Sequence, residues 1–148
     1  MIGHCVVDAS VGIKLFVREE WTDVVEAVFA GLGQEPPVRL FVPDLFYIEC
    51  ANILWKYVRR FNYATEEARS DLLDLRQLNL SVVATDALLP SAFDLAIEHS
   101  LTVYDACYVA LASMLGLPLL TADERLVNKM NGTTYDIRWI GDVALPDS

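Results

Sequence analysis

Short apolar runs alternate along the chain with longer segments in which apolar residues recur at helical spacing. The short runs are typical of buried strands, because they are apolar and stop at polar or turn-forming residues. They lie at 2–7, 80–85, 118–121 and 137–141. The predicted helices lie at 11–31 with a break near residue 19, and at 43–61, 65–78, 90–99, 105–115 and 122–130. Gly and Pro predict a loop over 31–43, with Pro43 in the first turn of the helix that follows.

This alternation predicts the fold class. Short apolar strands separated by helices are typical of α/β domains, in which a mainly parallel sheet is covered by helices on both faces. We therefore expect a three-layer α/β/α sandwich with a short, mainly parallel central sheet. The length of 148 residues fits a single domain spanning 1–148.

Composition raises the question of a membrane segment. Hydrophobic residues make up 54% of the chain, and its mean hydropathy is +0.34. A membrane-spanning helix needs roughly 20 apolar residues. The best candidate, 106–120, is shorter and is interrupted by Gly116 and Pro118. The N-terminal stretch lacks a basic region and reaches Asp8 too early for a signal peptide. We expect a cytoplasmic protein without a membrane partner.

Cysteines and charge narrow the chemistry. Cys5, Cys50 and Cys107 each have apolar neighbours and no zinc-site spacing, so we expect buried reduced thiols. The net charge of −10 argues against a large phosphate-binding surface. It does not exclude a metal-dependent nuclease, because bound divalent cations supply local positive charge.

Three aspartates are predicted to meet at one edge of the sheet. Asp8 ends the first strand, Asp123 follows the strand 118–121, and Asp105 begins the helix before that strand. In a parallel sheet the carboxyl ends of strands and the amino ends of the helices share one edge, where ligands bind. Taken singly, each aspartate is equally well explained as a helix cap. Taken together, they indicate a site for a hard divalent cation.

A fourth acid lies on an otherwise apolar helix. Helical spacing places Glu49 on one stripe with Leu45, Asn52 and Lys56. Spacing alone favours a solvated polar face over a functional role. Ser10 and Thr121 flank the Asp8 and Asp123 positions, where their hydroxyls would orient a ligand or cap a helix.

The motifs together resemble a known family. VVDASV, PDLFYIECANIL, LTVYDACYVALASMLGLPLLTADERL and IRWIGD lie in this order along nearly the whole chain, and the stretch 101–126 is the most specific of them. The sequence is similar to the PIN-domain family, in particular to VapC-like toxins of toxin–antitoxin pairs.

The resemblance implies a Mg²⁺- or Mn²⁺-dependent endoribonuclease that hydrolyses RNA phosphodiester bonds with metal-activated water. Its four catalytic and metal-binding acids would be Asp8, Glu49, Asp105 and Asp123, which resolves the choice for Glu49 in favour of the site. Ser10, Thr121 and Asn52 would support them. The family also implies a small cognate antitoxin and a homodimer.

Binding of RNA by an acidic protein requires local positive charge. Two groups of basic residues are candidates for phosphate contacts, although both are also explained as solvated helix faces. They are Lys14 and Arg18 on the first helix, and Lys56, Arg59 and Arg60 on the second.

Several alternatives stay open from the sequence. One is a PIN-like binding module that does not cleave. Another is a phosphoacceptor receiver-type domain, although the first strand has one following acid where a pair is expected. The apolar positions of the first helices suit either the core or a partner surface; they are Val24, Val25, Val28, Phe29, Phe46, Trp55 and Phe61.

Overall fold

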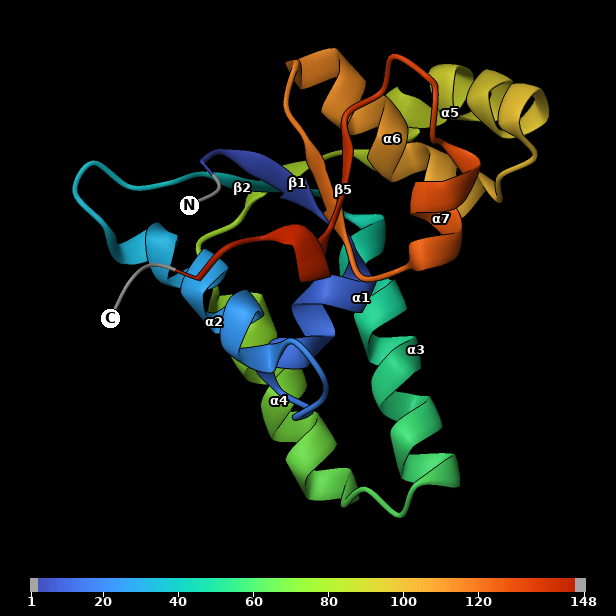
Figure 1. The fold of residues 1–148 in the computed structure, drawn as a ribbon. Helices are drawn as coiled ribbons and strands as arrows, with labels where there is room; N and C mark the ends of the chain where they lie inside the picture. The colour runs from blue at the N-terminus through green and yellow to red at the C-terminus, as the bar shows by residue number, and fades with distance from the viewer. Residues whose placement is uncertain (1–2, 146–148) are drawn as a thin grey trace.

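A computed structural model describes residues 3–145 and shows a five-stranded sheet between helices (Figure 1). The strands are β1 (Cys5–Val7), β2 (Leu40–Pro43), β3 (Ser81–Val83), β4 (Leu119–Thr121) and β5 (Ile137–Trp139). The helices are α1 (Ala9–Gly12), α2 (Thr22–Ala30), α3 (Leu45–Arg60), α4 (Thr65–Gln77), α5 (Thr85–His99), α6 (Val103–Leu115) and α7 (Glu124–Lys129). Short 3₁₀ turns are η1 (Ile13–Leu15), η2 (Gly31–Gly33) and η3 (Ile140–Asp142).

All strand pairs are parallel, in the order β3-β2-β1-β4-β5. The chain moves outward from β1 through β2 to β3, then returns to the other side of β1 as β4 and β5. The connection therefore changes direction between β1 and β4, which is where ligands bind in open parallel sheets. The predicted three-layer α/β/α class is confirmed.

The helices form two layers and one projecting hairpin. Figure 1 shows α5, α6 and α7 on one side of the sheet and α1 to α4 on the other. Helix α6 packs directly on β1, β2 and β4, and α5 packs on α6. Helices α3 and α4 lie side by side, and their far ends extend away from the sheet.

The core centres on β1 and α6. The side chains of β1 are completely buried, and seven consecutive residues of α6, from 106 to 112, are buried as well. Helix α6 is apolar all round because it lies between the sheet and α5. Cys5, Cys50 and Cys107 are buried free thiols, as predicted. None of the helices within residues 3–145 combines the length and hydrophobicity needed to cross a membrane.

Several predictions about element boundaries were wrong. The segment 31–43 is not all loop, because it contains strand β2, and Pro43 ends that strand instead of opening a helix. The ladder between β2 and β3 continues past Pro43, because the Asp44 N–H donates to the Val83 carbonyl at 3.0 Å. The helix expected at 90–99 begins at Thr85 instead, with Pro90 inside it.

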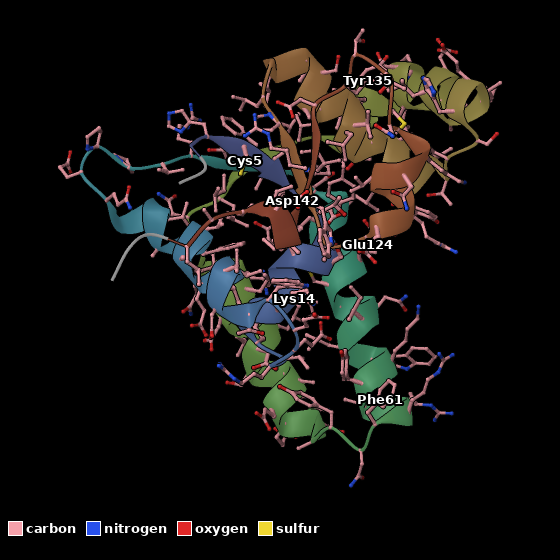
Figure 2. All side chains as sticks on the ribbon, viewed as in Figure 1. Cys5, Lys14, Phe61, Glu124, Tyr135 and Asp142 are labelled. Atoms are coloured by element: carbon pink, nitrogen blue, oxygen red, sulfur yellow. The ribbon has the colours of Figure 1, made fainter. Side chains whose placement is uncertain are left out.

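The apolar positions left open by the sequence divide between core and surface. Val24, Val25, Val28, Phe29 and Phe46 are buried. Trp55 and Phe61 are exposed, and Phe61 lies at the tip of the hairpin (Figure 2).

Close packing between α1 and α3 gives a test of the fold. A Cβ atom added at Gly12 would lie 2.5 Å from Cζ of the buried Phe46 ring. We expect Gly12→Ala to lower the free energy of unfolding by about 1–3 kcal/mol, because the ring must shift in a dense core. Urea denaturation measures this. Gly33→Ala is the matched control, since its Cβ would meet no atom within 4 Å. An unfolding free energy that Gly12→Ala leaves unchanged would contradict the packing described.

Candidate active site

Asp8 is buried at the carboxyl end of β1, and only 6% of it is exposed. Its carboxylate accepts hydrogen bonds from the Ser10 hydroxyl (2.5 Å), from the Thr121 hydroxyl and from the Val11 N–H (3.2 Å). The last bond makes Asp8 the N-cap of α1. Asp8 is thus both a cap and a buried carboxylate at the predicted edge.

The two hydroxyls also fix the ends of the neighbouring strands. Ser10 Oγ accepts the Ala122 N–H at 3.0 Å, and Thr121 Oγ1 accepts the Asp123 N–H at 3.0 Å. Because β1 and β4 are paired through Val7 and Leu120, the bond between Ser10 and Ala122 continues this pairing beyond the strands. Ser10 and Thr121 therefore hold the Asp8 carboxylate and the chain entering Asp123 in one fixed arrangement.

Asp105 is not a helix cap. Helix α6 begins at Val103, and the Thr102 side chain caps it by accepting the Asp105 N–H at 3.1 Å. The cap interpretation of Asp105 was wrong because the helix starts two residues earlier than the sequence indicated. Its half-buried carboxylate is consequently left available for other partners.

Asp123 is the N-cap of α7. Its Oδ1 accepts the N–H groups of Arg125 (3.0 Å) and Leu126 (3.4 Å). Capping uses one carboxylate oxygen, so the other oxygen can still face the site. The cap and site interpretations are compatible for Asp123, as they are for Asp8.

Glu49 faces the core side of α3. Its Oε1 accepts the hydroxyl of Tyr108 at 2.6 Å, and Tyr108 is 2% exposed. Glu49 is therefore anchored to α6, which is inconsistent with a merely solvated polar face. Asn52, the predicted supporting residue, is exposed. Together with Glu49 it lines a groove between α3 and the start of α6.

The charges of the four acids act on one another, with Asp105 in the middle. Burial raises the pKa of Asp105, and the Asp123 charge raises it further. Burial also raises the pKa of Glu49, with an added contribution from Asp105. Burial raises the pKa of Asp8 to about 6, against the lowering effect of Ser10, Thr121 and Val11, while the Asp105 charge adds to the rise. The structure thus brings all four predicted acids into one electrostatic group.

A small cavity beside this group contains two basic residues that sequence reasoning missed. Asp105, Asp123, Arg125 and Lys129 line a space of about 170 Å³ between α6 and α7. Arg125 and Lys129 lower the pKa of Asp105, and Lys129 also donates to the Ser100 carbonyl at 2.8 Å. The sequence contained one signal for these two residues, because they follow Asp123 by two and by six positions.

Tyr108 was also missed, although it lies three residues after Asp105 and so shares a helix face with it.

The basic residues predicted to contact RNA differ in availability. Lys14 is wrong as a phosphate contact, because it is 8% exposed and paired with Glu19 at 2.7 Å. Arg18 is exposed but pairs with Asp23 at 3.0 Å. The remaining three are exposed and form no ion pair with the rest of residues 3–145; they are Lys56, Arg59 and Arg60.

The donor chemistry fits a hard divalent cation. Within residues 3–145, no three His, Cys, Asp or Glu side chains are placed so that they could hold a metal ion together. Mg²⁺ needs less, because it binds one or two carboxylates and keeps several waters. Asp105 and Asp123 are the two carboxylates that could hold such an ion, and Asp8 and Glu49 interact electrostatically with Asp105.

Comparisons with known proteins agree on one family. The family model described as PIN domain matches residues 5–130. Ribonuclease VapC3 of Pyrobaculum aerophilum is 41% identical over 126 residues, which cover 84% of this chain and 92% of that protein.

Two solved structures share the fold. The crystal structure of PAE2754 from Pyrobaculum aerophilum has a TM-score of 0.65 at 24% identity, covering 95% of this chain and 92% of that one. A toxin–antitoxin complex from Klebsiella pneumoniae has a TM-score of 0.61 at 15% identity, covering 90% of this chain and 95% of that one.

Burial of Asp8 predicts a pH-dependent stability in metal-free buffer. Its pKa rises from 3.8 to about 6 on folding, so the folded state holds the proton more tightly than the unfolded state. This contribution therefore lowers stability as pH rises from about 4 to 6, and the loss persists above 6. We expect Asp8→Asn to raise the free energy of unfolding by about 2–3 kcal/mol at pH 7.5 and hardly at pH 4.

Urea denaturation at both pH values checks this prediction. Asp94→Asn, at an exposed position of α5, controls for a general effect of removing negative charge. If the free energy of unfolding of Asp8→Asn at pH 7.5 were equal to or below that of the unaltered protein, the buried Asp8 charge would not destabilise the folded state.

Proposed function

The chain belongs to the PIN-domain family, and on that premise we propose that it is a Mg²⁺- or Mn²⁺-dependent endoribonuclease. It would be the toxin component of a toxin–antitoxin pair acting in the cytoplasm. The observation that carries the proposal is the freedom of Asp105. Thr102 takes over the helix cap, which leaves a half-buried carboxylate among three other acids at the switch point of the sheet.

Asp105 and Asp123 would hold the cation, with Asp8 and Glu49 completing the group of acids. A bound divalent ion supplies Lewis acidity, which lowers the pKa of water and offsets charge on phosphate. This role fits the raised pKa of Asp105, because a cation favours the ionised carboxylate that burial and Asp123 disfavour.

The side chains of the protein orient the reactants. Ser10 and Thr121 fix the Asp8 carboxylate, and Tyr108 fixes Glu49, so that Glu49 orients the attacking water. Arg125 and Lys129 would bind a phosphate oxygen in the adjoining cavity. Water adds to phosphorus, the bond from phosphorus to O3′ breaks, and O3′ gains a proton. The products are a 5′-phosphate and a 3′-hydroxyl.

The relatives support the choice of substrate and partner. The Pyrobaculum relative is named a ribonuclease, and it matches 84% of the chain. The Klebsiella structure is a toxin–antitoxin complex, which supports a small antitoxin as partner. A homodimer is proposed on the family resemblance alone. Nothing specific favours a non-cleaving module or a receiver-type domain, since all four acids are present and the family match covers residues 5–130.

Neutralising Asp105 gives the direct test of the proposal. We expect Asp105→Asn to reduce Mg²⁺-dependent cleavage of a structured RNA by at least about 100-fold, because a ligand of the cation that would offset charge on the reacting phosphate is lost. Gel analysis with Mg²⁺ or EDTA measures it, and thermal unfolding checks the fold. Asp94→Asn is the matched control and should cleave normally. Full activity in Asp105→Asn would refute the assignment.

The unpaired cations at the end of α3 are proposed to contact RNA phosphates. Removing both charges in Arg59→Ala plus Arg60→Ala should weaken RNA binding. The plot of log affinity against log salt concentration should also become less steep by about 1.4, since each contact to single-stranded RNA contributes about 0.7. Binding is measured in EDTA at several salt concentrations. Arg138→Ala is the control, because Arg138 is already paired with Asp136 at 3.0 Å. An unchanged salt slope in the double variant would exclude these contacts.

A further inference from the structure

The cavity between α6 and α7, named here the α6–α7 cavity, holds two basic side chains beside two of the acids. It is lined by Asp105 and Asp123 together with Arg125 and Lys129. We propose that this cavity binds the 5′-phosphate monoester that cleavage leaves on the RNA product, so that the product is retained and inhibits the protein. The inference rests on the proposed function, because its ligand is the end that the reaction creates.

The size of the α6–α7 cavity suits a single phosphate group. Its volume is about 170 Å³. Pockets that enclose a whole small molecule measure about 300–1,000 Å³. The apolar part of the lining, Leu101 and Leu126, is buried. The cavity therefore accommodates a phosphate at the end of a chain, while the attached nucleoside stays outside.

The two basic side chains have donors to spare. The Arg125 guanidinium is exposed and forms no ion pair or hydrogen bond with other parts of residues 3–145. The Lys129 ammonium donates to the Ser100 carbonyl at 2.8 Å, which leaves donors free. A guanidinium binds two phosphate oxygens at once, and an ammonium binds phosphate as a point charge. The cavity thus offers unused donors of the kind that phosphate requires.

The balance of charge favours a monoester over a diester. The two acids in the lining carry two negative charges and the two basic residues carry two positive charges, so the lining alone is neutral. A divalent cation on the acids would change the net charge to about +2. A phosphate monoester carries about −1.5 to −2 at pH 7. A phosphodiester carries one negative charge, so the monoester is the closer match.

Hydrolysis would create this ligand where the cavity lies. The proposed reaction converts a diester beside Asp105 and Asp123 into a 5′-monoester, and the same two acids line the cavity. The phosphate gains negative charge in this step, so its attraction to Arg125 and Lys129 becomes stronger after cleavage than before. Release of the product is then slow compared with release of the substrate.

A competing explanation makes Arg125 and Lys129 counterions of the acids and nothing more. Both lower the pKa of Asp105, so they already stabilise its ionised form. As mere counterions they would weaken Mg²⁺ binding, and removal of Arg125 would strengthen that binding without affecting a nucleotide. Binding of a nucleotide therefore distinguishes the two explanations.

Isothermal titration calorimetry with mononucleotides tests the proposal. A mononucleotide has no phosphodiester bond to cleave, so Mg²⁺ can be present throughout. Uridine 5′-monophosphate should bind at least about 10-fold more tightly than its methyl ester, which carries one negative charge fewer. Adenosine 5′-monophosphate should bind with similar affinity, because only the phosphate enters the cavity. Replacing Mg²⁺ by EDTA should weaken binding, because the lining becomes neutral.

A matched pair of variants assigns the binding to the cavity. Arg125→Gln should weaken binding of uridine 5′-monophosphate by about 10-fold or more, since a charge-assisted hydrogen bond is lost. Arg76→Gln should bind as the unaltered protein does. Arg76 is exposed in the last turn of α4, on the other side of the sheet, and forms no ion pair among residues 3–145. Thermal unfolding checks that both variants fold.

Three outcomes would overturn the inference. One is equal affinity for uridine 5′-monophosphate and its methyl ester. Another is nucleotide binding that Arg125→Gln leaves unchanged. The third is binding of orthophosphate without binding of the nucleotide, which would reject an RNA end as the ligand.

Inhibition of cleavage tests retention of the product. A short RNA with a 5′-phosphate should inhibit cleavage more strongly than the same RNA with a 5′-hydroxyl. Arg125→Gln should remove this difference when each protein is compared with its own uninhibited rate. Equal inhibition of the unaltered protein by the two RNAs would contradict retention.

The inference and the proposed function fail separately. Binding of uridine 5′-monophosphate that requires Arg125 and Mg²⁺, in a protein that cleaves no RNA, would uphold the phosphate site and reject the nuclease. Cleavage that depends on Asp105, without a preference for the monophosphate over its methyl ester, would uphold the nuclease and reject the phosphate site.

Discussion

The site depends on a buried carboxylate held by two hydroxyls. Asp8 is surrounded by Ser10, Thr121 and the first turn of α1, and the same hydroxyls bind the chain that leads to Asp123. Burying a charge is costly unless hydrogen bonds compensate for it. Here the compensation is incomplete, since the pKa of Asp8 still rises to about 6. The hydrogen bonds between the ends of β1 and β4 therefore hold negative charge at the point where the order of strand connection reverses.

The other acids increase this concentration. The charge of Asp105 raises the pKa of Asp8 and of Glu49, and the charge of Asp123 raises the pKa of Asp105. A fold that gathers like charges gains stability and function together when a cation binds them. The adjoining Arg125 and Lys129 supply local positive charge, which lowers the pKa of Asp105. Acidic overall charge and RNA cleavage are compatible because the positive charge is local.

Local patterns predicted the strand ends and therefore the edge shared by Asp8, Asp105 and Asp123. Features that depend on residues distant in sequence were not predictable. Helix α5 begins at Thr85 because the Asp44 carboxylate accepts its N–H at 2.8 Å, from 41 residues away. Glu49 is fixed by Tyr108, 59 residues later, so only the family resemblance identified it. Strand β2 was hidden by nearby prolines, and the burial of Lys14 depends on its pairing with Glu19.

The central proposal is that Asp105 and Asp123, with Asp8 and Glu49 beside them, bind a divalent cation, and thermal unfolding against Mg²⁺ or Mn²⁺ concentration tests it most directly. A ligand that binds only the folded state raises stability in proportion to the logarithm of its concentration. The account predicts such a rise at neutral pH for the unaltered protein. It predicts no rise when Asp8, Asp105 and Asp123 are all replaced by Asn. A melting temperature indifferent to millimolar Mg²⁺ and Mn²⁺, or an equal rise in the triple variant, would contradict it.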